Sequence, residues 1–414
     1  VFCLQLILTS VFLLTNIHAQ EVELNGFVEV DHISYFENDD ERQINSRNQG
    51  ILQVELGKTL SEGASIFSAV EFREDQSDPL RNRFYLDEAY IDLYLSHFDF
   101  RLGKQIIVWG KADDINPTDN ITPFDLSDFL DTDDERIGVV ALKANYYVGN
   151  WTLEGIVVPA FVPSVLPLEN SLWVPNFQKT IPNPMNPATT VNVSYDFQPP
   201  IFPDENFSNV QFAGKISTTL SRWDFSVSYF QGWDDLPVLH QARQFVSNDS
   251  LHITLQPIYH PLKVIGGDFS TTFGKFGLRG EAGYYLTDAP DGKDSEIDTP
   301  YFRYVLGVDR TFSNVIGDNS LFVLIQWIGE ITQNGVEFHS DDLNHIFQRS
   351  IATRFEYDLT DFAKLSVQGA YNLKGRDYYV RPELSYHMSD GVNLNVSMDV
   401  LDGKEETFFG NYKD

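Results

Sequence analysis

Apolar and polar residues alternate along most of this chain, in segments of about ten residues separated by turns or loops. The segment 392–400 is the clearest, because every even-numbered position in it is aliphatic and every odd-numbered position is polar. Side chains of a β-strand point alternately to opposite faces, so this segment predicts a strand with one apolar face and one polar face.

About seventeen segments share this pattern. One of them, 223–233, has eleven residues, which at about 3.3 Å each and a tilt of roughly 45° cover about 25 Å, the height of the apolar band of an outer-membrane barrel. The predicted strands lie at 26–36, 50–60, 64–72, 84–95, within 98–110, and at 138–147, 151–161, 209–220, 223–233, 250–273, 276–286, 301–312, 320–331, 345–357, 362–373, 378–387 and 392–401.

Short and long connections alternate between these segments, as they do in barrels with short periplasmic turns and long outer loops. The pattern predicts an all-β protein, a transmembrane antiparallel up-and-down β-barrel of about 18 strands. We interpret 250–273 as one kinked strand with Pro257 at a bulge or rim, because that keeps the order of connections. An even total then requires one more strand after Asp414.

The first nineteen residues differ from the rest. The run 4–14 is apolar, uncharged and too short to span a membrane, and Ala19 precedes Gln20 as at a signal-peptidase site. We expect a signal peptide at 1–19 and a single barrel domain at 20–414. Cys3 lies in the predicted leader, so disulfides and thiolate metal sites are not expected in the remainder.

Composition fits this picture. After the leader no apolar run of about 18 residues predicts a membrane-spanning helix. A net charge of -31 argues against nucleic acid as a partner, and aromatic residues at 14% are abundant enough to mark two membrane interfaces. We therefore expect an integral protein of the outer membrane of a Gram-negative cell, in contact with the lipid bilayer and lipopolysaccharide, with an oligomeric state that the sequence leaves open.

The polar faces of the predicted strands carry charges of both signs. Either these charges pair across strands and stiffen the wall, or they produce a transverse field that orients a polar solute. The candidate pore-lining residues are Arg101, Gln105, Lys215, Arg279, Glu281, Arg303, Arg354, Glu356, Arg381 and Glu383.

Two long loops are expected, at 110–137 and 162–207. The second contains nine prolines and shows no strand pattern; it either packs on the surface or folds into the lumen as a constriction. The candidates for a constriction are Trp109, Asp113, Asp114, Asp119 and Trp173.

Metal and catalytic chemistry have weaker signals. Asp131, Asp133, Asp134 and Glu135 could bind calcium, which prefers carboxylate oxygens, although a solvated acidic face is the simpler interpretation. No other cofactor is expected. Single histidines at His252, His260 and His345 could sit at strand tips, but no nucleophile or zinc motif accompanies them, so we expect no enzyme activity.

One stretch carries a family resemblance. The residues that carry it are Arg101, Gly103, Gln105, Trp109, Gly110, Asp113, Asn116, Pro117 and Asp119, with Gly277, Arg279, Gly280, Glu281 and Ala282 in a later strand. In these residues the chain resembles porin-like outer-membrane barrels related to the alginate-export type, and the resemblance implies an 18-stranded passive channel without implying its substrate.

These observations predict a porin-like channel for passive diffusion of a small polar or oligomeric solute. Two alternatives remain at this point: a transporter of hydrophobic compounds, in which the apolar part of 162–207 forms a binding site, and a non-conducting barrel that serves as scaffold of an export or surface complex.

Overall fold

The computed structural model describes residues 2–11, 22–36, 46–113, 115–130, 136–167, 173, 179–183, 186–247, 249–289, 297–333, 335, 338 and 343–412. Nearly all regular structure in these ranges is β-strand. The helical pieces are short 3-10 turns, among them η1 (Pro79–Arg81), η2 (Phe207–Asn209), η3 (Leu343–His345) and η4 (Phe409–Tyr412). No helix among the described residues is long and apolar enough to cross a membrane.

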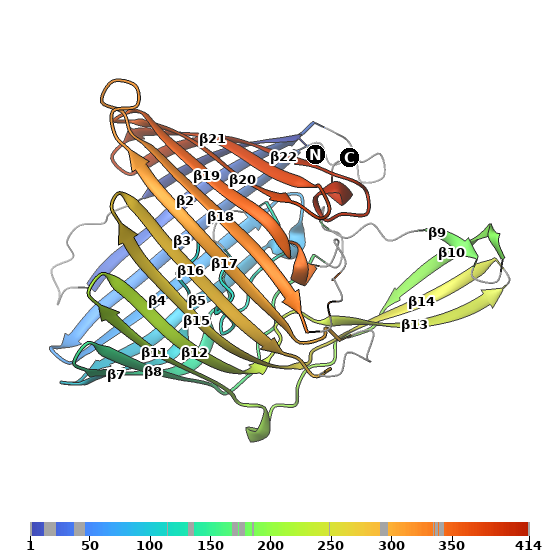
Figure 1. Ribbon diagram of the computed structural model, residues 1–414, viewed down its shortest axis with the longest axis horizontal. Coiled ribbons are helices and arrows are strands. Elements are labelled where there is room, and N and C mark those ends of the chain that lie inside the picture. The colour runs from blue at the N-terminus through green and yellow to red at the C-terminus, as the bar shows by residue number, and fades with distance from the viewer. Residues whose placement is uncertain are drawn as a thin grey trace.

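Eighteen strands form one antiparallel sheet that curves into a barrel (Figure 1). Consecutive barrel strands pair with each other, which is the up-and-down arrangement predicted from the sequence, and the predicted fold class is confirmed. The barrel strands are β1 (Phe2–Val11), β2 (Val22–Tyr35), β3 (Ser46–Ser61), β4 (Ala64–Asp75), β5 (Arg83–Tyr94), β6 (Phe98–Gln105), β7 (Val139–Val148), β8 (Trp151–Val158), β11 (Gln211–Leu220), β12 (Trp223–Trp233), β15 (Pro261–Phe273), β16 (Phe276–Leu286), β17 (Tyr301–Phe312), β18 (Leu321–Thr332), β19 (Arg349–Thr360), β20 (Ala363–Asn372), β21 (Tyr378–Ser389) and β22 (Val392–Asp402).

Strand β1 lies between the two ends of the remaining sheet. Cys3 pairs with Tyr35 of β2 on one side and with Asp399 of β22 on the other, both in antiparallel register. The place between β22 and β2, which the sequence analysis gave to a strand after Asp414, is therefore occupied by Phe2–Val11. The assignment of 1–19 as a signal peptide stays a prediction.

A second sheet of four strands projects from the end of the barrel at which both termini lie (Figure 1). It consists of β9 (Thr180–Asn183), β10 (Asn186–Phe197), β13 (Val238–Ser247) and β14 (Ser250–Ile258). The single kinked strand predicted over 250–273 is wrong, because the chain leaves this sheet after Ile258 and enters the barrel at Pro261. The added hairpin of β13 and β14 lies outside the barrel, so the alternation of short and long connections survives.

The expectation that 162–207 lacks strands is also wrong. Pro182 is tolerated in β9 because β9 is an edge strand that pairs with β10 alone, and Pro187 lies in β10 at the register irregularity between Asn186 and Thr190. In β10 the apolar Val193, Tyr195 and Phe197 pack against a cluster of buried β10 and β14 side chains. The signal was thus present at 192–197, where apolar and polar residues alternate.

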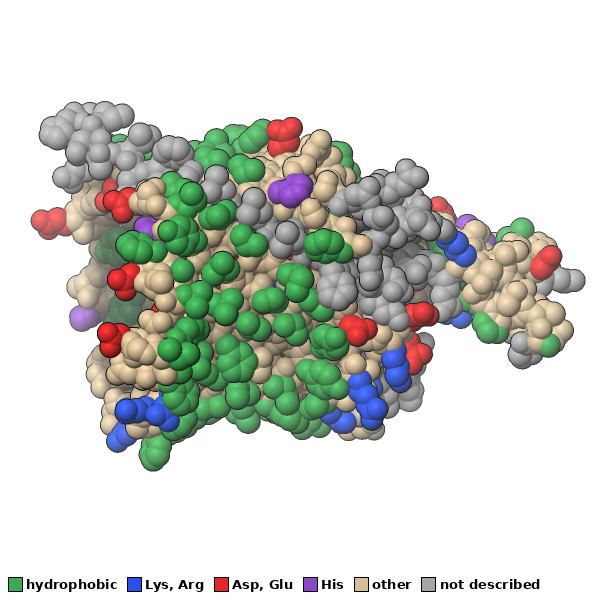
Figure 2. Space-filling view, turned by 90° about the horizontal axis from the view of Figure 1, so that it is seen from above, with side chains coloured by type: hydrophobic (Ala, Val, Ile, Leu, Met, Phe, Trp, Pro, Cys, Tyr) green, Lys and Arg blue, Asp and Glu red, His purple; other side chains and the backbone are tan. Residues whose placement is uncertain are grey.

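The outer surface of the barrel is apolar. Figure 2 shows hydrophobic side chains gathered across its side, with charged groups toward the ends. Mid-strand residues such as Leu102, Val227 and Leu306 are more than half exposed, whereas Gln105, Ser226 and Val305 of the same strands are buried. An apolar exterior on a barrel of this size is what a bilayer requires, and the protein is an integral outer-membrane barrel.

One added positive charge is expected to have different effects on the lipid-facing and the lumen-facing side of the barrel wall. Replacing Val227, on the exterior of β12, by Arg is expected to destabilise the barrel by about 2–4 kcal/mol, the cost of a cation near the bilayer midplane. The matched Ser366→Arg change on the polar face of β20, where Ser366 lies opposite Glu356 and Glu383, is expected to cost less than about 1 kcal/mol. Denaturant unfolding from lipid vesicles measures both, and equal losses would contradict the assignment of faces.

Candidate functional site

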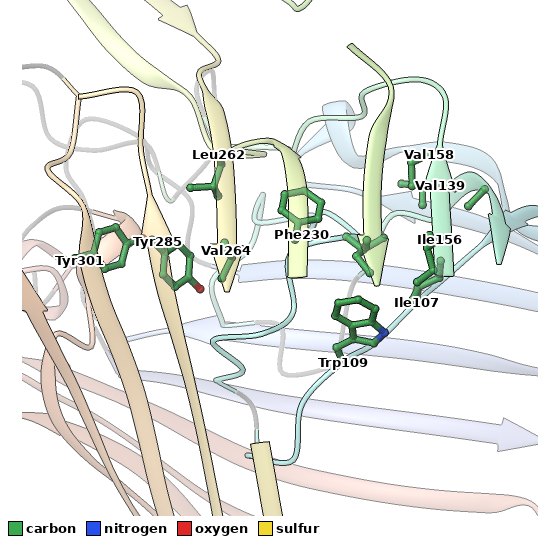
Figure 3. Close-up of a cluster of buried hydrophobic side chains, with 13 residues drawn as sticks. Ile107, Trp109, Val139, Ile156, Val158, Phe230, Leu262, Val264, Tyr285 and Tyr301 are labelled. Carbon is green, nitrogen blue, oxygen red and sulfur yellow. The ribbon is translucent and has the colours of Figure 1, made fainter. Parts of the chain in front are cut away.

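The connection between β6 and β7 enters the barrel interior. We call residues 106–138 the constriction loop. Its first residues, Ile107 and Trp109, are each only 2% exposed and pack against inward-facing side chains of β8, β12 and β15 (Figure 3). The chain turns there at Gly110, whose φ of +110° and close approach to Asn116 and Glu281 leave no room for a Cβ atom.

Glu281 on β16 holds this turn. Its carboxylate accepts hydrogen bonds from the backbone N–H groups of Lys111 (2.8 Å), Ala112 (3.1 Å) and Thr118 (2.7 Å) and from the Thr118 hydroxyl (2.8 Å). Glu281 is 3% exposed, and a buried carboxylate is tolerated when its oxygens are satisfied in this way. The loop is therefore fixed to a wall far away in sequence.

Asp113 forms a second link to the same side of the barrel. Its carboxylate oxygens accept from the guanidinium of Arg279 on β16 at 2.6 Å and from that of Arg354 on β19 at 3.3 Å. Arg279 also donates to Asp309 on β17 at 2.7 Å. The side chains of Arg279 and Arg354 remain 27% and 29% exposed, so they also face open space in the interior.

Trp109 leads to a further cluster of charges. Its indole N–H donates to Glu154 on β8 at 2.5 Å, and the ammonium of Lys215 on β11 lies 4.9 Å from the ring centroid. Lys215 and Lys143 lie 3.7 Å and 3.6 Å from Glu154 oxygens. The predicted residues Trp109 and Lys215 thus meet around one carboxylate.

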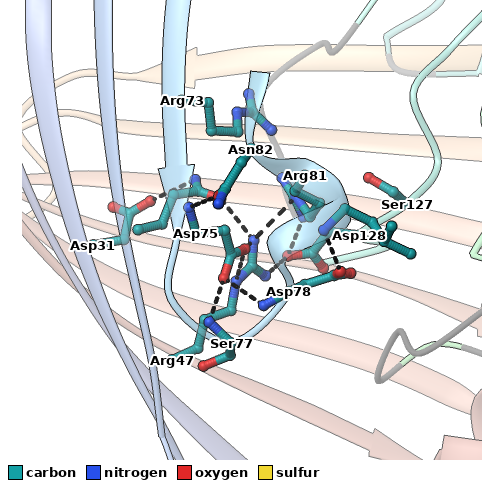
Figure 4. Close-up of polar contacts among 12 residues, drawn as sticks. Asp31, Arg47, Arg73, Asp75, Ser77, Asp78, Arg81, Asn82, Ser127 and Asp128 are labelled. Carbon is teal, nitrogen blue, oxygen red and sulfur yellow. Dashed lines mark hydrogen bonds and ion pairs between the residues drawn. The ribbon is translucent and has the colours of Figure 1, made fainter. Parts of the chain in front are cut away.

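The second half of the constriction loop is anchored on the other side of the lumen. Asp128 pairs with Arg47 of β3 and, at 3.0 Å, with Arg81 of η1, and Arg47 reaches Asp75 at 2.6 Å (Figure 4). Burial opposes the charge of Asp128, but the two guanidiniums outweigh it and lower the pKa of this carboxyl to about 2. Further along, Arg381 of β21 donates to the carbonyl of Leu130 at 2.9 Å.

The loop is braced internally as well. Asp119 pairs with Arg136 and accepts from the backbone N–H of Trp109 at 3.2 Å. Burial nevertheless raises the pKa of Asp119 to about 7, because desolvation outweighs the attraction of Arg136. This pair joins the two ends of the loop.

The other predicted residues lie apart from this centre. Arg101 pairs with Asp92 at 2.7 Å nearer the short turns, and Gln105 is fully buried, with its amide donating to the carbonyl of Ala141 at 2.9 Å. Arg303 pairs with Glu330 at 2.6 Å near the outer mouth. Arg101 and Gln105 make contacts within the wall, whereas Arg303 also donates to the backbone carbonyl of Asn344 in the connection between β18 and β19.

Glu356 and Glu383 pair with arginines of their own strands, Glu356 with Arg354 of β19 at 3.4 Å and Glu383 with Arg381 of β21 at 3.6 Å. Arg381 is only 2% exposed, so it lies inside the barrel but behind the loop rather than on open lumen. Trp173 packs against Phe129 and Tyr412 in an aromatic cluster at the outer end, with the loop tip.

Some predictions fall outside the described residues. Asp114 of the predicted constriction lies there, as does the whole predicted calcium site of Asp131, Asp133, Asp134 and Glu135. Within the described ranges no group of three or more His, Cys, Asp or Glu side chains is placed to hold a metal ion.

Sequence reasoning missed the network of Arg47, Asp75 and Asp128; Arg47 and Asp75 stand at polar positions of alternating strands, which was a usable signal. It named His345 only as a single histidine and did not foresee its contacts. The two ring nitrogens of His345 lie 2.7 Å from Glu330 and 3.0 Å from Asp298. Its partners are 15 and 47 residues away in sequence, and only folding brings them together.

Comparison with known proteins gives a family and distant structural likenesses. A family model described as "Protein of unknown function (DUF1302)" matches residues 11–291. The chain is similar to the outer-membrane protein OmpT of Vibrio cholerae in its trimer form, with 11% identity, 97% and 98% of the two chains covered and a TM-score of 0.41. It is also similar to a triple mutant of the Rhodopseudomonas blastica porin, with 8% identity, 92% and 100% covered and a TM-score of 0.43.

Likenesses this distant carry no argument about function, and no curated protein matches the chain. The resemblance to alginate-export-type porins stays a prediction.

Replacing Glu281 by Gln is expected to loosen the constriction loop. The carbonyl oxygen of a neutral amide accepts hydrogen bonds more weakly than a carboxylate, and the amide NH2 group would face N–H groups that need an acceptor. We therefore expect the free energy of local opening of the loop to fall by about 1.5–3 kcal/mol. Hydrogen exchange at the amides of Lys111, Ala112 and Thr118 measures it. Glu55→Gln is the control, because Glu55 on β3 lies opposite Asn25 and Ala69 and away from these amides. Equal exchange in both variants would contradict the anchoring role.

His345 makes stability depend on pH. Burial disfavours the charged ring, but the hydrogen bonds to Asp298 and Glu330 outweigh it and raise the pKa of His345 to about 9. The unfolded value is near 6.5, so this contribution is fully present below about pH 6.5 and is lost as pH rises to about 9. The melting temperatures of the wild type and of His345→Gln should therefore differ most at pH 6, and the difference should narrow by pH 9.5. A difference that does not depend on pH would contradict this role of His345.

Proposed function

The chain belongs to the DUF1302 family of proteins of unknown function, and from that premise we propose that it is a porin-like channel of the outer membrane. Its cargo on this proposal is a small polar or oligomeric solute that crosses by passive diffusion. The bilayer, with lipopolysaccharide in its outer leaflet, surrounds the apolar exterior.

One observation carries the proposal: a loop is fixed across the lumen by contacts to both walls. Glu281, Arg279 and Arg354 hold its first half, and Arg47 and Arg381 hold its second half. A loop held at both ends narrows a barrel without filling it, and charged groups at a narrow point select among solutes. This arrangement supports a constriction.

The exposure of the charged groups supports an aqueous passage beside the loop. Arg101, Lys143, Lys215, Arg279 and Arg354 keep between 21% and 29% of their side-chain surface exposed. By contrast, Arg47, Arg81 and Arg381 are at most 4% exposed. The covered guanidiniums come from β3, η1 and β21, whereas the partly exposed cations come from β6, β7, β11, β16 and β19.

The apolar interior favours this function over transport of hydrophobic compounds. Ile156, Phe230 and Val264 do face inward, but Ile107 and Trp109 of the constriction loop cover them (Figure 3). Covered side chains of this kind are packed core rather than a vacant apolar path.

Single-channel recording tests the proposal. Reconstituted protein in planar bilayers is expected to give a stable conductance with cation preference, because the chain's excess negative charge gathers counter-ions at the mouths. Asp113→Ala uncovers the guanidiniums of Arg279 and Arg354, so we expect a shift of the reversal potential toward anions. Asp361→Asn, on the turn between β19 and β20, is the matched control.

Three results would contradict the proposal. A correctly folded barrel without conductance would favour a scaffold, and saturable uptake of apolar compounds with little ion current would favour the hydrophobic transporter. Equal reversal potentials for Asp113→Ala and the control would remove the constriction from the conducting path.

A further inference from the structure

A cavity of about 210 Å³ lies between the constriction loop and the outer ends of β12, β15, β16 and β17. Loop residues such as Asn116 and Asp119 form one side, and Trp233, Asp234, Tyr285 and Tyr301 are on the wall side. The volume is below the roughly 300–1,000 Å³ of sites for drug-sized ligands, so only a small molecule fits.

The charges around this cavity do not balance locally. Its lining includes three carboxylates, those of Asp119, Asp234 and Asp235, and two guanidiniums, those of Arg136 and Arg303. Arg136 is paired with Asp119, and Arg303 is paired with Glu330 outside the lining. Both cations are therefore engaged by other carboxylates.

Among the described residues, the side chains of Asp234 and Asp235 accept hydrogen bonds from neutral groups only, and the guanidiniums that attract them, Arg303 and Arg136, are paired with other carboxylates. Asp234 accepts from the backbone N–H of Leu236 at 3.1 Å, and Asp235 accepts from the Ser164 hydroxyl at 2.5 Å. Burial, followed by the neighbouring charge of Asp235, raises the pKa of Asp234 to about 7. Two adjacent carboxylates whose nearest guanidiniums are paired elsewhere are costly at a site of this kind, and a bound cation would offset the cost.

Aromatic rings complete the lining. Tyr285 and Tyr301 are stacked with their centroids 4.6 Å apart, and Trp233 lies at the end of β12 (Figure 3 shows the two tyrosines beside Leu262). The rings already attract a cation, since the guanidinium of Arg303 lies 5.3 Å and 5.5 Å from the two tyrosine centroids. A carboxylate pair next to aromatic faces is the chemistry that recognises organic ammonium groups.

We propose that this cavity binds a small organic cation, with its ammonium group against Asp234 and Asp235 and its hydrocarbon part against Trp233, Tyr285 and Tyr301. The site lies on the outer side of the constriction loop, so a bound solute would wait there before the narrow part of the lumen. The proposal deepens the channel function and rests on it for this role, but the binding itself can be measured separately.

Binding to the full chain in detergent at pH 8, where Asp234 is ionised, tests the proposal directly. The probes are 2-phenylethylamine and its neutral counterpart 2-phenylethanol, measured by calorimetry and by quenching of tryptophan fluorescence. The amine is expected to bind saturably and at least about tenfold more tightly than the alcohol. Equal affinities for the two probes would overturn the proposal.

Variants assign the binding to this cavity. Asp234→Asn/Asp235→Asn keeps the shape of both side chains and removes their charge, so the affinity for the amine should fall about tenfold or more while that for the alcohol stays within about twofold. Asp318→Asn, on the exposed turn between β17 and β18, is the control and should bind as wild type. If the double variant does not fold, as judged by heat-modifiable mobility on gels, Asp234→Asn alone is measured.

Unchanged affinity for the amine in a folded variant would place the site elsewhere and overturn the proposal. The two proposals fail in distinguishable ways. A barrel that binds the amine through Asp234 and Asp235 but carries no current refutes the channel and leaves the cation site standing. A conducting barrel that does not bind the amine selectively refutes the cation site and leaves the channel standing.

Discussion

The constraint on which the whole structure depends is that no backbone hydrogen-bonding group may be left unpaired in lipid. A sheet satisfies it only when its two edges meet, and here every barrel strand has a partner on both sides, with β1 joining β22 to β2. Closure then divides the side chains into two populations. Those that point outward must be apolar, and those that point inward are free to carry charge.

That freedom explains the interior. Charges face inward from most of the ring, and each has to be paired or hydrated. The protein does this in two ways. Near β3, β4 and β21, the constriction loop covers Arg47, Arg81 and Arg381 and supplies Asp128 and a carbonyl oxygen as partners. Near β16 and β19, Asp113 bridges two arginines that keep contact with open space.

The loop is therefore held by electrostatics and hydrogen bonds at its contacts and by packing at its base. Trp109 shows both, since its ring is buried among aliphatic side chains while its N–H reaches Glu154. Asp119 and Arg136 connect the two ends of the loop, so the anchors on opposite walls act on one braced segment. A segment of this kind has few alternative positions, which suits a loop that sets the width of a passage.

The sequence by itself determined the barrel, the alternation of short and long connections and the direction in which side chains face, because a period of two along a strand is a local property that each segment reports alone. It also singled out Asp113, Trp109, Arg279 and Glu281, but as separate candidates. Only the tertiary structure decided that Glu281 binds backbone N–H groups 163 to 170 residues away, that Arg381 is covered, and that 250–273 is divided between two sheets. Those outcomes depend on which strands face each other across the lumen. Closure of the ring decides which strands do so, and no single segment encodes it.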